Sequence, residues 1–280
     1  MVIEDIDSLD DSRLDVYRDL KTRNVVRDAN LFIAEGPTVV ERLLRSRFEV
    51  QSVLISERKM ESFGDRLPAD IPIYRLPHSL AQQLVGYSFH SGVMASGVRQ
   101  TLVSLPVEPE ERLSSENRKL ILAGDRIVDP ENVGALIRIA SAFGAAAVIF
   151  GPGSADPFSR RVLRVSMGNV LFLPVVETPD LPAELARLTS LNYEVCATIL
   201  DPLVTPLHEH NFHDHTALVF GNEYDGVSAE VLASCRKRLT IPMLNGTDSL
   251  NIAVSAGIFA HAFRAQHYSP VQPSEPGPSR

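Results

Sequence analysis

Hydrophobic positions in the second half of the chain gather in short, almost unbroken apolar runs that amphipathic stretches separate. The runs are KLILAGD (119–125), AAAVIFG (145–151), LFLPVV (171–176), YEVCATI (193–199), TALVFGN (216–222) and RLTIPM (238–243). Strands that are apolar on both faces are typical of a sheet covered by helices on both sides, and such sheets are mostly parallel. The pattern therefore predicts an α/β domain over residues 118–267, whose last helix covers roughly 250–266.

The first half of the chain predicts a second, smaller α/β domain over residues 12–100. Its predicted strands are LFIAE (31–35), VQSVLIS (50–56), IPIYRL (71–76) and SGVMASGV (91–98), and its predicted helix is PTVVERLLRSRF (37–48). An acidic segment, 1–11, precedes this domain. Residues 101–117 carry prolines and charges without an apolar period, which predicts a linker. Residues 268–280 contain four prolines and almost nothing to bury, which predicts a disordered tail.

Composition excludes several classes of protein. The net charge of −8 argues against a protein that coats nucleic acid through bulk positive charge, although a local basic patch remains compatible with it. Two cysteines are too few for a disulfide framework, and the acidic start resembles no targeting peptide, so we expect a reduced, cytoplasmic setting. No apolar run is long enough to span a membrane.

A histidine-rich stretch, HEHNFHDH (208–215), raises the question of a metal site. Its histidines do not have the H-E-x-x-H spacing that binds zinc on one face of a helix. The two cysteines also lack a metal-ligand spacing. We therefore expect a solvated loop here and no metal.

Polar residues collect at three predicted strand ends of the second domain. These segments are DRIVDPENVGALIR (125–138), FGNEYDGVS (220–228) and IPMLNGTDSLN (241–251). Each has a local structural explanation, as a turn or as the cap of a helix. Ligands of an open parallel sheet nevertheless bind beyond the carboxyl ends of its strands. The presence of all three clusters together predicts a binding site there.

Arg138 is the one charged residue within the apolar stretch NVGALIRIASAFGAAAVIF (132–150). A helix through this stretch presents an apolar stripe formed by Val133, Leu136, Ile137, Ala140 and Phe143. The neighbours of Arg138 at helical spacing are small, namely Gly134, Ala135, Ser141 and Ala142. Another backbone or a ligand can therefore approach this face. The alternative is an arginine that reaches solvent or pairs with a carboxylate such as Asp125.

Taken together, these segments resemble the SpoU–TrmH family of RNA ribose 2′-O-methyltransferases, which belongs to the SPOUT class. The first family motif is matched by Asn132, Gly134 and Arg138, the second by FGNEYDG, and the third by IPMLNGTDSLN with the helix after it. The first domain, through LFIAEGPTVVERLL and SGVMASGV, looks like the family's L30e-like substrate-binding domain.

The resemblance implies a particular fold and activity. It implies an α/β fold in which a SPOUT domain with a deep trefoil knot follows the small L30e-like domain. Physical rules alone disfavour any knot, because chains almost never thread loops. It also implies S-adenosylmethionine bound in the knot, a homodimer with active sites near the subunit interface, and methyl transfer to a ribose 2′-hydroxyl of structured RNA, either rRNA or tRNA.

The resemblance also assigns roles to residues. The catalytic set it implies is Arg138, Asn132, Glu223, Ser249 and Asn251. The cofactor contacts it implies are Phe220, Gly221, Asn222, Ile241, Met243 and Leu250. For RNA contact we expect the local positive stripe formed by Arg160, Arg161 and Arg164.

Several alternatives stay open at this point. Arg138 is assigned to activating the hydroxyl, but a free guanidinium is a poor base, so it can instead fix the ribose through a phosphate. A non-catalytic RNA-binding protein on the same fold is a second reading, which the presence of Arg138 and of Ser-Leu-Asn (249–251) disfavours. A dinucleotide-binding enzyme is a third, disfavoured because the chain has no G-x-G-x-x-G fingerprint. The identity of the RNA and of its nucleotide is open.

Overall fold

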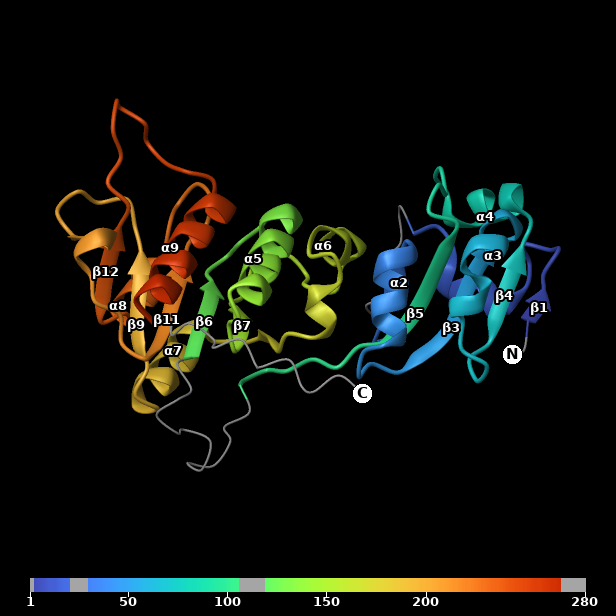
Figure 1. Ribbon diagram of the computed structural model, residues 1–280, viewed down its shortest axis with the longest axis horizontal. Helices are drawn as coiled ribbons and strands as arrows, with labels where there is room; N and C mark the ends of the chain where they lie inside the picture. The colour runs from blue at the N-terminus through green and yellow to red at the C-terminus, as the bar shows by residue number, and fades with distance from the viewer. Residues whose placement is uncertain (1–2, 21–29, 106–118, 268–280) are drawn as a thin grey trace, which may run out of the picture.

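The computed structural model describes residues 3–20, 30–105 and 119–267, which form two lobes along the long axis of the molecule (Figure 1). Each lobe is built on one sheet with helices packed beside it. Most of the predicted linker and the whole predicted tail lie outside the described residues. Within the described ranges, no helix is long and apolar enough to cross a membrane.

The first lobe contains a five-stranded mixed sheet in the order β1-β4-β3-β5-β2. Its strands are β1 (Ile3–Asp5), β2 (Leu31–Glu35), β3 (Val50–Ser56), β4 (Ile73–Leu76) and β5 (Val93–Val98). Its helices are α2 (Pro37–Leu44), α3 (Glu57–Phe63) and α4 (His78–Val85), with the short 3₁₀ turns η1 (Ser12–Tyr17) and η2 (Gly64–Arg66). The four strands predicted here are confirmed, whereas β1, α3 and α4 had no counterpart in the sequence analysis.

The boundaries of this lobe differ from the prediction at two places. The sequence places residues 1–11 outside the first domain, but β1 pairs in parallel with β4 and supplies the edge of the sheet. Ile6 is buried behind it, so this acidic segment belongs to the lobe. The helix predicted over 37–48 ends at Leu44, because the chain turns there and the Ser46 hydroxyl donates a 2.8 Å hydrogen bond to the Leu43 carbonyl.

The second lobe contains a seven-stranded sheet in the order β10-β12-β9-β11-β6-β7-β8, and every neighbouring pair is parallel. The strands are β6 (Lys119–Gly124), β7 (Ala147–Phe150), β8 (Val175–Glu177), β9 (Glu194–Thr198), β10 (Thr205–Pro206), β11 (His215–Phe220) and β12 (Lys237–Thr240). The helices are α5 (Pro130–Ala142), α6 (Arg160–Val165), α7 (Leu181–Ser190), α8 (Ala229–Ala233) and α9 (Ile252–His267), with the turns η4 (Asn169–Leu171) and η5 (Leu207–Glu209). The predicted parallel sheet is confirmed.

The run LFLPVV is the one predicted strand of this lobe that is mostly wrong. Leu171 ends the turn η4, and only Val175 and Val176 belong to a strand, β8. Leu171 and Leu173 are still buried. A short apolar run indicates that a segment is buried. Burial alone does not distinguish a strand from a packed turn.

Helices cover both faces of the second sheet, as the unbroken apolar runs require (Figure 1). On one face α5 and α9 pack in a buried cluster that includes Leu122 and Leu218. On the other face α7 and α8 pack in a cluster that includes Ile121 and Val219. Successive residues of β6 and β11 thus point into opposite cores, as strand geometry demands.

The two lobes share buried contacts. The ring of Phe158 from the second lobe lies 5.4 Å from that of Phe32 and 5.6 Å from that of Phe48. Arg99, at the end of the first lobe, is 7% exposed and pairs with Asp156 and Glu177 of the second. Because a buried arginine is stable only when its charge is compensated, these pairs hold the lobes in one arrangement.

Candidate active site

A pocket of about 520 Å³ opens at the carboxyl ends of β9, β11 and β12. This volume suits a ligand the size of a nucleoside cofactor. Phe220, Ile241 and Phe259 give the pocket an apolar wall. The predicted site residues that line it are Phe220, Gly221, Asn222, Glu223, Ile241, Met243, Ser249, Leu250 and Asn251. The structure therefore brings together two segments that the sequence separates.

The loop after β11 requires glycine at its first position. A Cβ atom on Gly221 would lie 2.1 Å from the backbone of both Gly226 and Val227, which is far inside van der Waals contact. Gly226 has a φ of +68°, in the region that favours glycine. The two glycines therefore allow the loop to fold back closely on itself.

Asn222 holds this loop in shape. Its backbone exchanges two 3.0 Å hydrogen bonds with Gly226, and its side-chain amide donates a 2.8 Å bond to the carbonyl of Arg126. Its side-chain oxygen accepts from the Tyr224 backbone at 2.9 Å. The side chain and the backbone of Asn222 are therefore both engaged within the protein, and its predicted contact with a cofactor stays a prediction. The loop so held presents Glu223 at the pocket.

Three predicted catalytic residues from three segments form one hydrogen-bonded chain. Asn132, in the first turn of α5, donates a 2.8 Å hydrogen bond from its amide to the carboxylate of Glu223. Its oxygen accepts from the amide of Asn251 at 3.3 Å. Asn251 also caps α9, since its oxygen accepts from the Ala253 backbone at 2.8 Å. The contacts of Asn251 are thus compatible both with a role as helix cap and with the predicted role in catalysis.

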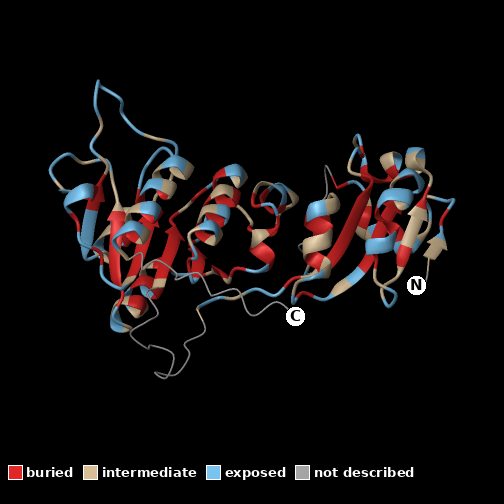
Figure 2. Cartoon of the chain, viewed as in Figure 1, coloured by how far each residue is buried: buried red, intermediate tan, exposed pale blue. Residues whose placement is uncertain are grey.

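The loop between β12 and α9 rises beside the pocket and is exposed over most of its length (Figures 1 and 2). Leu244 at its tip is 78% exposed. Ser249 lies on the pocket wall and makes no hydrogen bond within the described residues. Its hydroxyl is available to a ligand.

Arg138 lies outside the pocket of its own chain. It follows Asn132 by six residues of α5, which places it about 9 Å farther along the helix axis. Its side chain is exposed and has no ion-pair partner among the residues that the structure describes. Asp125, considered above as its partner, instead accepts a 2.7 Å bond from the backbone of Ser228. Among the described residues the ion-pair explanation of Arg138 is therefore contradicted, whereas the alternative of an arginine that reaches solvent agrees with its exposure.

Gly134, one of the small residues beside Arg138, has a packing role. A Cβ atom on Gly134 would lie 2.7 Å from Val165 and 3.2 Å from the carbonyl of Val162, both in α6. The expectation that another backbone approaches this helix closely is confirmed, and the backbone belongs to the same chain.

A second pocket, of about 860 Å³, lies between the lobes and is lined by Arg160, Arg161 and Arg164 together with the start of α2. Arg160 is held by the first lobe, because it pairs with Glu35 at 3.1 Å and donates to the Leu20 carbonyl at 2.7 Å. Its guanidinium also lies over the ring of Tyr87. Burial, and then the nearby carboxylate of Glu35, raise the pKa of the Tyr87 phenol.

The other two arginines of this stripe are less constrained. Arg161 pairs with Glu131 at the exposed surface. Arg164 is exposed, and no ion pair engages it within the described ranges. Arg164 is thus the cation of the three that is most open to a polyanion.

Sequence reasoning missed several residues of the main pocket. Thr198, the last residue of β9, and the next two residues, Ile199 and Leu200, line it, as does Phe259 of α9. β9 ends in an ordinary apolar run without a polar cluster, so no local signal marks it. Only the strand order, which places β9 between β12 and β11, brings this segment to the site.

Comparison with known proteins agrees with this geometry. Residues 119–261, which contain the pocket and the hydrogen-bonded chain, match the SpoU rRNA Methylase family. The chain belongs to this family. The resemblance seen in its motifs is therefore confirmed.

Relatives and solved structures extend the match to both lobes. The chain is 33% identical over 275 residues to an uncharacterized tRNA/rRNA methyltransferase of Mycobacterium tuberculosis strain H37Rv, covering 95% of this chain and 93% of that protein. It is 29% identical to the 23S rRNA (guanosine(2553)-2′-O)-methyltransferase of Bacillus subtilis, covering 94% and 100%. The AdoMet-bound rRNA methyltransferase of Sinorhizobium meliloti has the same fold, with a TM-score of 0.80 at 22% identity over 95% of this chain and 99% of that one.

Proposed function

We propose that this protein transfers a methyl group from S-adenosylmethionine to a ribose 2′-hydroxyl of rRNA or tRNA. The observation that carries the proposal is the chain Glu223–Asn132–Asn251, which joins all three family motifs at the rim of one pocket. The names of its relatives, tRNA/rRNA and 23S rRNA methyltransferases, support the same class of substrate.

The pocket suits the cofactor chemically. Its apolar wall, formed by Phe220, Ile241 and Phe259, would hold a planar adenine, and backbone groups beside Gly221 and Leu250 would contact its edge. A glycine-rich phosphate cradle is not needed, because S-adenosylmethionine carries no phosphate. When bound, this group supplies a methyl on a positively charged sulfur.

The protein's own contribution to the reaction is positioning. The ribose 2′-oxygen would take the methyl group that the cofactor supplies, and the hydroxyl proton would pass to solvent. Orienting the two reacting groups toward each other would contribute most of the acceleration. The carboxylate of Glu223, fixed by Asn132, and the hydroxyl of Ser249 would orient the two substrates at the pocket. Arg138 would clamp a phosphate beside the reacting ribose.

Arg138 requires a second copy of the chain to reach a pocket. α5 and α9 run side by side in the same direction, because Asn132 contacts Asn251 at one end and Arg264 donates to the Phe143 carbonyl at the other. Arg138 and Ile258 therefore lie at similar heights on two neighbouring helices, and both are exposed. We propose a homodimer through this face, in which Arg138 of each subunit serves the pocket of the other.

Exposed apolar side chains on the same face support this dimer. Val254 is 51% exposed and Ile258 is 38% exposed, one helical turn apart on α9. Ile139 and Ala135 of α5, the helix that packs against α9, are partly exposed as well. Exposed apolar side chains on two neighbouring helices are typical of a surface that a partner covers.

RNA would enter through the groove between the lobes. The groove presents Arg164, Arg161 and the exposed His90, although the chain as a whole is acidic. Phosphate contacts need only a local basic surface. Replacing Arg164 with Glu should weaken RNA binding at least tenfold in a filter-binding assay, whereas the same change at Arg45, which follows α2 directly and whose side chain is 74% exposed, should not.

The proposal also includes an L30e-like first lobe, a knot in the second lobe and a cytoplasmic location. The first lobe, in which three helices and two 3₁₀ turns surround a mixed sheet in the described residues, would be the L30e-like RNA-binding domain. The return of the chain from β12 across the sheet to α9, beside α5, supports a trefoil knot in the second lobe. Reduced thiols and an RNA substrate fit a cytoplasmic enzyme.

One experiment tests the activity directly. The purified protein is incubated with methyl-labelled S-adenosylmethionine and total RNA from cells that lack it, and the RNA is then digested and analysed by mass spectrometry. We expect label in one 2′-O-methylated nucleotide. Label on a base would contradict the proposal. RNA binding with cofactor bound and no label in RNA would favour the non-catalytic RNA-binding protein.

A further inference from the structure

Another group of polar side chains lies in the second lobe, at the opposite end of β9 from the cofactor pocket. Glu194 begins this strand and Thr198, which lines the pocket, ends it, so about 13 Å of strand separates the two places. Glu194 and Cys196 point to the same face of the sheet, because alternate residues of a strand do. His210 approaches them from the turn that follows η5.

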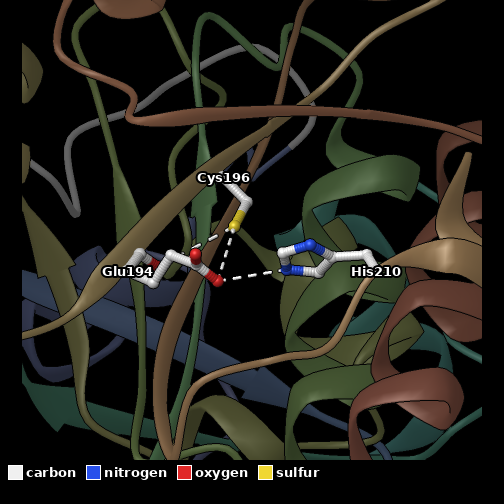
Figure 3. A group of neighbouring side chains, drawn as sticks. All are labelled: Glu194, Cys196 and His210. Carbon is white, nitrogen blue, oxygen red and sulfur yellow. Dashed lines mark hydrogen bonds and ion pairs between the residues drawn. The ribbon is translucent and has the colours of Figure 1, made fainter. Parts of the chain in front are cut away.

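Three different donor atoms converge at this place (Figure 3). Nε2 of His210 lies 3.1 Å from Oε2 of Glu194, and Sγ of Cys196 lies 3.6 Å from the same oxygen. All three atoms lie within 4.8 Å of one another, and all three residues are buried. Ligand atoms about 2.0–2.3 Å from a tetrahedral zinc ion lie roughly 3.3–3.8 Å apart, so small movements would complete such a site.

The three ligand atoms lie in largely apolar surroundings. Cys196 belongs to the apolar cluster that contains Leu207, Phe212 and Phe263. A carboxylate buried in such surroundings costs several kcal/mol unless its charge is compensated. A divalent cation bound to one carboxylate, one thiolate and a neutral imidazole makes a group with no net charge, which this core can hold.

We propose that Glu194, Cys196 and His210 bind one structural zinc ion. His213 supplies the fourth ligand, since its Nε2 lies 3.8 Å from Oε1 of Glu194 and its side chain, 65% exposed, is free to turn inward. Mixed sulfur, nitrogen and oxygen donors in a closed site favour zinc over magnesium or calcium. On binding, the Cys196 thiol becomes a thiolate, and its proton passes to solvent.

The ion would fasten the end of the chain to the sheet. The loop that carries His210 is joined to α9, because Gln266 donates to the His210 carbonyl at 2.7 Å and accepts from the Phe212 backbone at 2.9 Å. Zinc would therefore connect β9 to the last turn of α9. Its distance from the pocket makes this role structural, and the proposal stands apart from the methyl-transfer reaction.

This proposal departs from the expectation drawn from the sequence. The histidine-rich stretch was set aside because its spacing is not H-E-x-x-H. The structure brings two pairs of possible ligands together from different segments, Glu194-x-Cys196 on a strand and His210-x-x-His213 in a loop.

The test uses the full-length, untagged protein purified without chelator. Elemental analysis should find about one zinc per chain. After chelation and dialysis, titration with Co²⁺ should produce a thiolate-to-cobalt charge-transfer band in the near ultraviolet, which reports the Cys196 ligand. Zinc added to the metal-free protein should raise its Tm by about 5 °C.

Matched variants separate this site from adventitious binding. Cys196→Ser and His210→Gln should lose both the cobalt band and the zinc-dependent rise in Tm. Cys235→Ser and His208→Ala, which alter the other cysteine and an exposed histidine of the same stretch, should keep them. Circular dichroism establishes whether each variant folds. If a variant does not fold, the cobalt spectrum of the unaltered protein still tests whether a thiolate is a ligand. A cobalt complex without the charge-transfer band, or zinc binding that Cys196→Ser leaves unchanged, would overturn the proposal.

Discussion

The amide of Asn132 donates a 2.8 Å hydrogen bond to the carboxylate of Glu223, across 91 residues of sequence. Asn132 is buried and Glu223 is exposed at the pocket, so the bond ties an exposed acidic side chain to the start of α5. Asn132, from the first family motif, therefore orients the carboxylate of Glu223, from the second.

This pairing predicts energetic coupling between the two residues. Asn132→Asp removes the donor and places a negative charge against Glu223, so it should lower the free energy of unfolding by about 1–3 kcal/mol. Adding Glu223→Gln should recover about 1 kcal/mol, because the glutamine amide can donate back to the new aspartate. Urea unfolding of the two single variants and the double variant measures this. Strictly additive losses would show that the residues do not interact.

Gly221 predicts a sharp effect on cofactor affinity. Because a Cβ atom would overlap the backbone of Gly226 and Val227, Gly221→Ala must shift the loop that walls the pocket. Calorimetry should show at least a tenfold loss of affinity for S-adenosylmethionine, on the order of 1.4 kcal/mol or more. Gly64→Ala is the control, since its Cβ would meet only the flexible end of Met60. Unchanged binding in a folded Gly221→Ala protein would place the cofactor elsewhere.

Arg138 is expected to act in the reaction without supporting the fold. Its exposure and lack of an ion pair within the described residues predict that Arg138→Ala changes stability by no more than about 0.5 kcal/mol. Single-turnover methyl transfer should fall by about a hundredfold or more. Arg138→Lys should also fail, because an ammonium cannot form the planar fork of a guanidinium. Normal activity per folded molecule would remove Arg138 from the mechanism.

If Arg138 acts on the pocket of the partner subunit, the Arg138→Ala and Gly221→Ala variants should complement each other in a mixed dimer. A mixture of Arg138→Ala and Gly221→Ala subunits, refolded together, should contain heterodimers in which one pocket is intact and faces an intact Arg138. The mixture should be more active than either variant alone. No recovery from heterodimers whose formation has been demonstrated would mean that Arg138 serves its own subunit.

Ile258 tests the surface through which the dimer forms. Ile258→Glu places a charge in the apolar stripe of α9 and should convert the dimer to a monomer at micromolar concentration in light scattering. Leu203→Glu is the matched control, because Leu203 is an apolar residue 92% exposed on another part of the lobe. A dimer that survives Ile258→Glu but dissociates with Leu203→Glu would mean that the interface lies around Leu203 and not on α9.

Tyr17 predicts a loss of stability at alkaline pH. Burial raises the pKa of its phenol to about 12, even though its hydrogen bonds with Ser52 and Ser96 act in the opposite direction. In the unfolded chain this pKa is about 10, so the folded protein holds the proton more tightly. The associated stability is complete below pH 10 and is lost as the pH rises toward 12.

Urea unfolding at pH 8, 10 and 11 measures this dependence. Tyr17→Phe should be less stable at pH 8 by about 1 kcal/mol, because it loses the hydroxyl's bonds to Ser52, and its stability should decline less steeply above pH 10. Parallel declines in the two proteins would assign the alkaline transition to other groups.

Some features of this protein were determined by the sequence alone. Unbroken apolar runs such as KLILAGD predict buried parallel strands, because a strand covered on both faces has no polar side. The three polar segments were recognised as strand ends, and Arg138 was recognised as out of place in its helix. These properties are local, since each depends on residues a few positions apart.

Other features were decided only by the tertiary structure. The bond between Asn132 and Glu223, the pairing of Arg160 with Glu35 and the meeting of Cys196 with His210 all join separate segments. Local periodicity specifies whether a segment is a strand and which of its faces is buried, but it carries no information on which strands become neighbours. The order of the strands follows from packing the whole chain, and that order brings these side chains together.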